Sequence, residues 1–156
     1  MIYFAYGSNL DPVQWAARCP DSPVVGVAIL DHHRLHFPRR SPVRGCAVAS
    51  VAPAAGNTVW GVLYRMTDVD FAGLDKREGH YPDRHPSESR YLRATVTVTQ
   101  GETGALEAVT YRANPAPEPG LPSPDYMAHM IAGALHHRFP ENYVAMLRAQ
   151  PTTDQA

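Results

Sequence analysis

The alternation of apolar and polar residues along the chain predicts several short strands separated by helices. The clearest strand is Val59–Tyr64, which is apolar on both faces, as expected for a strand buried in the middle of a sheet. Ile2–Ala5 is a second apolar strand, and Val24–Leu35 reads as a third with a bend near Asp31. Further strands are expected at Cys46–Val51, Tyr91–Thr99 and Leu106–Tyr111, the last two joined by a hairpin turn.

Capping residues predict where the helices begin and end. Asp and Pro open the segment Asp11–Arg18 as a favoured N-cap and first helical residue. Thr67, with Asp70 three residues later, resembles a capping box and predicts a helix that runs to Glu78 and ends at Gly79. Two more helices are expected over residues 123–138 and 140–149.

Segments rich in proline, glycine and charged residues predict the loops Pro38–Arg44, Pro53–Asn57, His80–Arg90 and Asn114–Pro124. Strands outnumber helices, and hairpins connect the strands of the second half. This pattern is typical of an α+β fold with a curved sheet or small barrel and helices packed outside it. We expect a single domain over residues 1–150 and a disordered tail over residues 151–156.

Length and composition limit the classes of function. A chain of 156 residues can bury one core and is too short for two ordinary domains. With a formal net charge of −1, the chain as a whole offers no electrostatic basis for binding nucleic acid or an anionic membrane.

No apolar run approaches the length of a transmembrane helix, and no signal-peptide pattern precedes the first strand. We therefore expect a cytoplasmic protein in which Cys19 and Cys46 are reduced thiols.

The turn after the first strand, Tyr6-Gly7-Ser8-Asn9-Leu10, is the first candidate site. A glycine turn between a strand and a helix start aims several backbone N–H groups at one point, which suits an anion or a carbonyl oxygen gaining negative charge. Glu78 is the best candidate partner. At a helix C-terminus, burial would raise its pKa and make it a usable base near neutral pH. The alternative is an ordinary solvated glutamate.

Other candidate chemistry has weaker support. Ser8 does not fit the G-x-S-x-G pattern of a nucleophilic serine, because Leu10 takes the second glycine position. Tyr6 and Tyr126 are the tyrosines best placed to touch a ligand. The histidines lack a metal-site spacing and read as surface or lightly buried side chains: His32, His33, His36, His136 and His137. A local group of arginines reads as a solvated loop or as a loop that meets an acidic substrate: Arg34, Arg39, Arg40 and Arg44.

Four motifs occur in order: Tyr3-Phe4-Ala5-Tyr6-Gly7-Ser8-Asn9-Leu10, Val59-Trp60-Gly61-Val62, Leu74-Asp75-Lys76-Arg77-Glu78-Gly79 and Pro122-Ser123-Pro124-Asp125-Tyr126. In this order they resemble the gamma-glutamylcyclotransferase family, and the similarity extends to about residue 148. The resemblance implies a small mixed β-barrel with flanking helices. It also implies an intramolecular aminolysis in which a γ-glutamyl amide closes to 5-oxoproline and releases an amine.

The resemblance also implies roles for individual residues. Glu78 matches the catalytic glutamate. The substrate-binding positions it implies are Tyr3, Phe4, Ala5, Tyr6, Gly7, Ser8, Asn9, Leu10, Tyr91 and Tyr126. The substrate is a small molecule, no cofactor or metal is implied, and the family analogy allows a homodimer.

Two alternatives remain open at this point. The chain could act on a γ-glutamylamine with a different amine, or it could be a non-catalytic binding module for a glutamyl-like ligand. The His80–Arg90 segment is longer than the family resemblance leads us to expect, and the motifs do not name the leaving amine. An amino acid, a peptide such as glutathione and a polyamine all fit.

Overall fold

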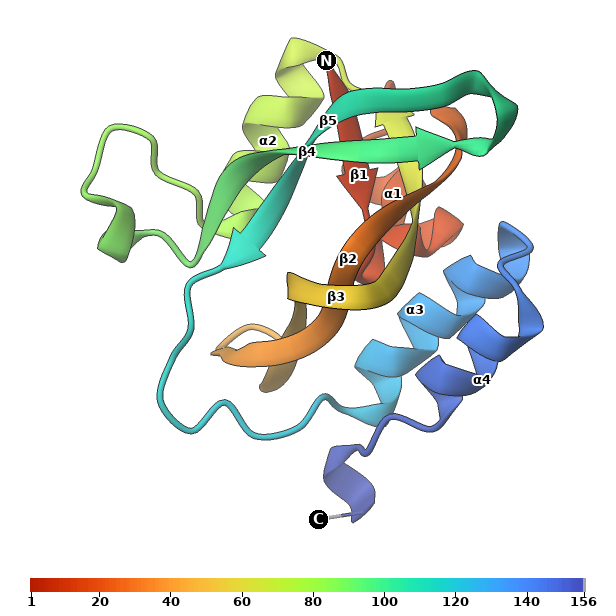
Figure 1. The fold of residues 1–156 in the computed structure, drawn as a ribbon. Helices are drawn as coiled ribbons and strands as arrows, with labels where there is room; N and C mark the ends of the chain where they lie inside the picture. The colour runs from red at the N-terminus through yellow and green to blue at the C-terminus, as the bar shows by residue number, and fades with distance from the viewer. Residues whose placement is uncertain (156) are drawn as a thin grey trace.

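Five strands close into a barrel in the computed structural model, which describes residues 1–155 (Figure 1). The strand order around the barrel is β1-β3-β2-β4-β5. β5 meets β1 in a parallel pairing, and the other pairings are antiparallel, so the barrel is mixed. The strands are β1 (Ile2–Ala5), β2 (Val24–Ser41), β3 (Cys46–Arg65), β4 (Tyr91–Gln100) and β5 (Gly104–Ala113). The expected α+β barrel is confirmed.

The long β2–β3 hairpin differs from the sequence expectation. β2 continues through most of the predicted Pro38–Arg44 loop, and β3 runs without interruption through the predicted turn Pro53–Asn57. The irregular residues lie at shifts in the register of the β2–β3 pairing. One shift falls between Asp31 and His33. His32 and Gly56 take positive φ values of 58° and 82° at this shift. A bulge therefore bends the hairpin where the composition indicated a chain reversal.

The helices follow their predicted caps. They are α1 (Pro12–Arg18), α2 (Asp68–Glu78), α3 (Pro124–His136) and α4 (Glu141–Arg148). The side chains of Asp11, Thr67 and Ser123 each accept a hydrogen bond from a backbone N–H in the first turn of the helix that follows. Gly79 ends α2 in the left-handed conformation, with φ 68°. Local side-chain chemistry thus placed these helix ends correctly.

Short 3-10 helices occupy three of the connections and the C-terminal segment: η1 (Ser8–Leu10), η2 (Pro86–Glu88), η3 (Gly101–Thr103) and η4 (Thr153–Gln155). The last of these lies within the predicted tail. Thr152 is buried, and the Thr153 N–H donates to the Pro122 carbonyl at 3.0 Å, so the tail is tied to the segment before α3. Residue 156 lies outside the described residues.

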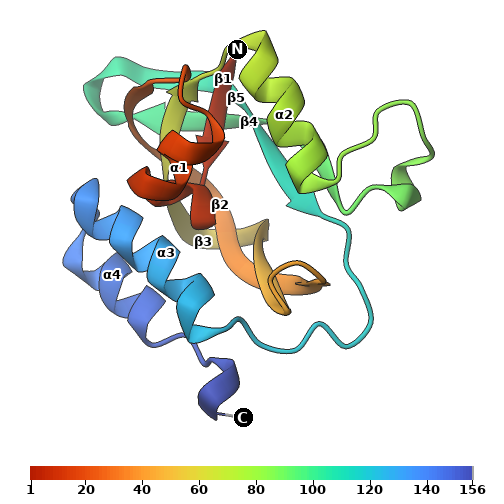
Figure 2. The same cartoon turned by 180° about the vertical axis from the view of Figure 1, so that it is seen from behind.

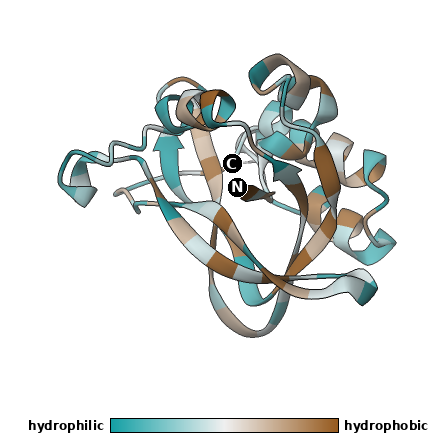
Figure 3. Cartoon of the chain, turned by 90° about the horizontal axis from the view of Figure 1, so that it is seen from above, coloured by the Kyte–Doolittle hydropathy of each residue, from teal (hydrophilic) through white to brown (hydrophobic). Residues whose placement is uncertain are grey.

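The hydrophobic core fills the barrel and continues beneath the helices. Apolar residues follow the strands and the inner faces of the helices, whereas the projecting loops are polar (Figure 3). α2 lies on one side of the barrel, and α3 and α4 lie together on the other (Figures 1 and 2). α3 packs directly on η1, because Gly133 has no side chain at the contact with Leu10. Within residues 1–155, no helix is long and apolar enough to cross a membrane.

The Gly133–Leu10 contact predicts an effect of substitution on stability. A Cβ atom at Gly133 would lie 2.3 Å from the backbone carbonyl group of Leu10, so we expect Gly133→Ala to separate α3 from η1 and to destabilise the protein by about 1–3 kcal/mol. Gly73 in α2 is the matched control, since a Cβ atom there meets nothing within 4 Å. Gly73→Ala should stabilise the protein by about 0.5–1 kcal/mol. Thermal denaturation of both variants tests this, and equal melting temperatures would contradict it.

Candidate active site

A cavity of about 350 Å³ opens beside the turn after β1. Its walls come from that turn, the C-terminal end of α2, the start of β4, the end of the β2–β3 hairpin and the first turn of α3. Figure 2 shows these segments gathered on one side of the molecule. The volume falls within the range of about 300–1,000 Å³ that is usual for small-molecule sites.

Glu78 enters this cavity as the last residue of α2. Gly79 reverses the chain there, and its carbonyl accepts a hydrogen bond from the Arg90 N–H at 2.9 Å. The Asn9 amide Nδ2 lies 3.4 Å from Glu78 Oε1 and donates to it. The Glu78 side chain is half-buried, lines the cavity and is bonded to the turn after β1.

Asp75, three residues before Glu78, fastens α2 to the barrel. Its carboxylate accepts two hydrogen bonds from Arg93 of β4, at 2.9 and 2.7 Å, and one from the Tyr111 hydroxyl of β5, at 2.5 Å. A bidentate arginine–carboxylate pair fixes orientation as well as distance. Because Asp75 lies one helical turn before Glu78, these bonds set the position of the catalytic candidate.

Asn9 connects the turn after β1 to its surroundings. Its Nδ2 also donates to the Tyr3 hydroxyl at 3.1 Å. Its Oδ1 accepts from Gln14 Nε2 at 3.1 Å and from Arg18 Nη1 at 2.9 Å. The backbone carbonyl of Asn9 accepts from the Tyr64 hydroxyl at 2.8 Å. Asn9 is buried, and these bonds hold its amide in one orientation toward Glu78.

Ser8 has neutral and cationic neighbours. Its hydroxyl oxygen accepts from Gln14 Nε2 and from Arg44 Nη2, each at 3.0 Å. Among the hydrogen bonds of residues 1–155, none joins this hydroxyl to a histidine or a carboxylate. A nucleophilic serine requires such a base, so the geometry favours binding over nucleophilic attack.

A bulge in β2 exposes the backbone of Ala49 to the cavity. His36 pairs with Ser50 and Arg39 pairs with Val48, so Ala49 has no partner residue in β2. Two tyrosine hydroxyls replace that partner. The Ala49 N–H donates to Tyr126 at 3.0 Å, and the Ala49 carbonyl accepts from Tyr91 at 2.5 Å.

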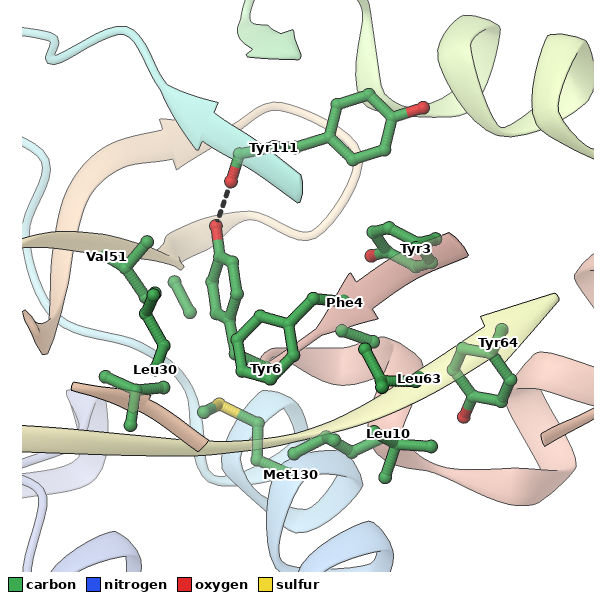
Figure 4. Close-up of a cluster of buried hydrophobic side chains, with 14 of the residues drawn as sticks. Tyr3, Phe4, Tyr6, Leu10, Leu30, Val51, Leu63, Tyr64, Tyr111 and Met130 are labelled. Atoms are coloured by element: carbon green, nitrogen blue, oxygen red, sulfur yellow. Dashed lines mark hydrogen bonds between the residues drawn. The ribbon is translucent and has the colours of Figure 1, made fainter. Parts of the chain in front are cut away.

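Burial keeps the tyrosines of the cavity protonated. It raises the pKa of Tyr126 to about 12 and also raises the pKa values of Tyr3, Tyr6 and Tyr91, and the nearby Glu78 acts in the same direction. The Tyr6 hydroxyl donates to the Tyr111 carbonyl (Figure 4). At neutral pH the interior of the cavity therefore presents uncharged hydroxyl groups around one carboxyl group.

The pKa of Glu78 is raised above its ordinary value. Burial is the largest cause, because it disfavours the charged carboxylate. Arg18, the Asn9 hydrogen bond, Arg44 and Arg90 oppose it, in that order. A carboxyl group with a raised pKa can take up and return a proton near neutral pH, which is what general acid–base chemistry requires.

The structure brings most of the sequence candidates together. Those that line the cavity are Tyr3, Tyr6, Gly7, Ser8, Asn9, Glu78, Tyr91 and Tyr126. Phe4, Ala5 and Leu10 are not among the lining residues, so the cavity gives no support to the predicted substrate contact at these three. All three are 0% exposed and belong to the core, where Figure 4 shows Phe4 and Leu10. Side chains alternate along β1, so Phe4 points to the opposite side of the strand from Tyr3.

The sequence did not identify Arg18 and Tyr111 as site residues, and it left the role of Arg44 open. All three line the cavity. The i, i+4 spacing of Gln14 and Arg18 on α1 would have put both on the face next to Asn9. Tyr111 had no local signal, because a strand with apolar neighbours does not show which side faces a cavity.

Arg39 and Arg40 also line the cavity, whereas the candidate histidines and both cysteines do not. Within the described chain, no group of three or more His, Cys, Asp or Glu side chains could hold a metal ion. Cys19 and Cys46 are both free and buried.

Comparison with known proteins agrees with the fold and the motifs. A model of the AIG2-like family matches residues 58–147, more than half of the chain, and the chain belongs to that family. The gamma-glutamylcyclotransferase of Bos taurus is 29% identical over 157 residues, which cover 98% of this chain and 80% of the bovine protein. The Homo sapiens gamma-glutamylcyclotransferase is 28% identical over 157 residues, with the same coverage.

A solved structure of a gamma-glutamyl cyclotransferase matches the fold with a TM-score of 0.88 and 27% sequence identity. The match covers 99% of this chain and 89% of that one. The family resemblance and the mixed barrel expected from the motifs are therefore confirmed.

The raised pKa of Glu78 predicts a pH-dependent difference in stability. An acid whose pKa is higher in the folded than in the unfolded state stabilises the fold when protonated, and this contribution is lost as the pH rises through the folded-state pKa. Glu78→Gln cannot lose a proton. We therefore expect its melting temperature to rise relative to the wild type as the pH increases from about 4 to about 7.5. Thermal melts at several pH values measure this difference.

Glu102→Gln is the control, because Glu102 is exposed in the β4–β5 turn. Its melting temperature should keep a nearly constant offset from the wild type. A constant offset for Glu78→Gln as well would show that the carboxyl group is not desolvated in the folded protein.

Proposed function

We propose that this protein is a cyclotransferase that converts a γ-glutamyl amide into 5-oxoproline and a free amine. The observation that carries the proposal is the Glu78 carboxyl group facing the Gly7–Asn9 turn across one cavity. Relatives named gamma-glutamylcyclotransferase, similar over nearly the whole chain, support it.

Glu78 acts in the proposal as a proton carrier. The substrate binds with its α-ammonium group beside the carboxylate, which takes one proton. The freed amine nitrogen attacks the γ-carbonyl carbon and forms the new C–N bond of the ring. The old amide C–N bond then breaks as Glu78 returns the proton to the departing nitrogen. The ring nitrogen gives up its second proton through the same carboxylate, so the ring ends as a neutral lactam N–H and the amine departs as an ammonium ion. No water is consumed, and no group outside the protein and substrate takes part.

The turn after β1 stabilises the intermediate in this proposal. As the amine attacks, negative charge develops on the γ-carbonyl oxygen, and the backbone N–H groups of Gly7 and Ser8 are the proposed donors to it. One such donor typically lowers the barrier by about 3 kcal/mol. The ring closure is already intramolecular, so holding the flexible glutamyl chain bent contributes the rotamer entropy of that chain, about 1–2 kcal/mol.

Glu78→Gln tests the proposed role of the carboxyl group. The amide has the same shape and cannot carry the proton, so we expect loss of 5-oxoproline release by at least about 100-fold, the usual contribution of a general acid–base group. Mass spectrometry of 5-oxoproline from a panel of γ-glutamyl amino acids, peptides and amines provides the measurement.

Glu102→Gln should retain the wild-type rate and serves as the matched control. Ring closure at a near-normal rate in Glu78→Gln would rule out this mechanism. A wild-type protein that binds glutamyl ligands and never forms 5-oxoproline would instead be a binding module. If the protein released 5-oxoproline only from γ-glutamyl amines, it would be a γ-glutamylamine cyclotransferase.

Ser8→Ala separates binding from nucleophilic attack. Because the Ser8 hydroxyl contacts only Gln14 and Arg44 in the part of the chain that the structure describes, its loss should weaken turnover by about 3- to 10-fold, the equivalent of one hydrogen bond. Steady-state rates of the variant measure the loss. Complete inactivity, together with an acyl adduct trapped on Ser8 of the wild type, would favour the nucleophile instead.

A further inference from the structure

The cavity concentrates positive charge in a chain that is nearly neutral as a whole. Half of the fourteen basic residues line it: the only lysine, Lys76, and the arginines Arg18, Arg39, Arg40, Arg44, Arg77 and Arg90. Glu78 is the one carboxylate among the lining residues. A net charge of −1 for the chain therefore conceals a strongly cationic site.

Within residues 1–155, no cation of the cavity forms an ion pair with an acidic side chain, and Glu78 is the carboxyl group that acts on Arg18, Arg44 and Arg90. The ion pairs formed within residues 1–155 are Arg93–Asp75 and His129–Asp11, and neither involves a cation of the cavity. Arg18 and Arg44 bond to uncharged oxygens: Arg18 donates to Asn9, and Arg44 donates to Ser8 and Gln14. Their charge remains available to an anion in the cavity.

Helix termini explain only part of this pattern. Lys76 and Arg77 lie in the last turn of α2, where a cation is favoured by the helix dipole whether or not a ligand binds. Arg39 and Arg40 lie on β2, on the other side of the opening, and have no helix end to complement. Arg40 is exposed at the rim.

Arg39 is held in place with part of its guanidinium group unused. Its Nη1 donates to the Asn114 carbonyl at 3.0 Å, which ties β2 to the segment after β5. Its buried Nε has no hydrogen-bond partner among the described residues. A buried donor without a partner is costly, so the hydrogen bonds of Arg39 within the described residues do not satisfy its whole guanidinium group.

A γ-glutamyl group alone does not match so many cations. It carries one ammonium group, assigned above to Glu78, and one α-carboxylate, which one or two of these arginines can bind. We propose that the amine released by this enzyme is a dicarboxylic amino acid, glutamate or aspartate, whose carboxylates lie between Arg39 and Arg40 on one side and the end of α2 on the other. This inference rests on the proposed cyclotransferase function and names its substrate class.

The reaction balances with such a leaving group. The α-nitrogen of the γ-glutamyl unit bonds to its own γ-carbonyl carbon, and the bond from that carbon to the nitrogen of the departing glutamate breaks. The two protons that the attacking ammonium loses on becoming the lactam N–H both end on the departing amine. The products are 5-oxoproline and free glutamate, with no oxidant, water or other reactant.

A pair of substrates that differ by one charge tests the inference. γ-Glutamyl-glutamate and γ-glutamyl-glutamine have nearly the same shape, and only the first carries the extra carboxylate. With wild-type protein at low salt we expect kcat/KM to be about tenfold higher for γ-glutamyl-glutamate, mainly through KM, because several cations act on one added charge. Raising the ionic strength to about 1 M should remove most of this preference.

Variants of the rim identify the responsible side chains. Arg40→Gln and Arg39→Gln should each reduce the preference for γ-glutamyl-glutamate several-fold by raising its KM more than that of γ-glutamyl-glutamine. Arg65→Gln is the matched control: Arg65 is exposed at the end of β3, does not line the cavity, and should leave the ratio unchanged. Because Arg39 also bonds to Asn114, melting temperatures accompany the kinetics, and the exposed Arg40 carries the test if Arg39→Gln unfolds.

The outcomes separate this inference from the proposed function. Equal kcat/KM for the two substrates, or a preference that survives both rim variants, would overturn the assignment while leaving the cyclotransferase activity intact. Failure to release 5-oxoproline from either substrate or from any other γ-glutamyl amide would instead overturn the proposed function, and the inference with it.

Discussion

The candidate site depends on how the turn after β1 is held between the barrel and α3. Gly133 lets α3 approach the backbone of Leu10, and the Tyr64 hydroxyl binds the Asn9 carbonyl from the barrel side. With its backbone fixed in this way, Asn9 directs its amide to Glu78, 69 residues later in the chain. One side-chain amide therefore links the two parts of the site, and its geometry is set by core packing.

The polar groups of the site form two layers that affect the pKa of Glu78 in opposite directions. Inside, burial keeps the tyrosine hydroxyls protonated and raises the pKa of Glu78, so the carboxyl group sits among neutral donors. At the opening, basic side chains lower the same pKa and attract anions. Neither layer alone would suit proton transfer near neutrality: full burial would keep Glu78 permanently protonated, and full exposure would keep it permanently ionised.

Local sequence signals predicted the helices well and the β2–β3 hairpin poorly. Asp11, Thr67 and Gly79 act on backbone groups within a few residues, so their effect can be read without knowing the fold. Turns and bulges use the same types of residue, so the residues near His32 and Gly56 fit either one. Only the pairing partner across the sheet decides between the two, and that partner is distant in sequence.

The sequence by itself determined the family, the strand–turn–helix at the start of the chain and the glutamate at the end of α2. Each of these can be recognised from a short stretch of consecutive residues. The tertiary structure alone decided which side chains face the cavity: it placed Phe4, Ala5 and Leu10 in the core and brought in Arg18 and Tyr111. The direction of a side chain in a barrel depends on strand register and curvature. Both arise from long-range packing, which no local pattern encodes.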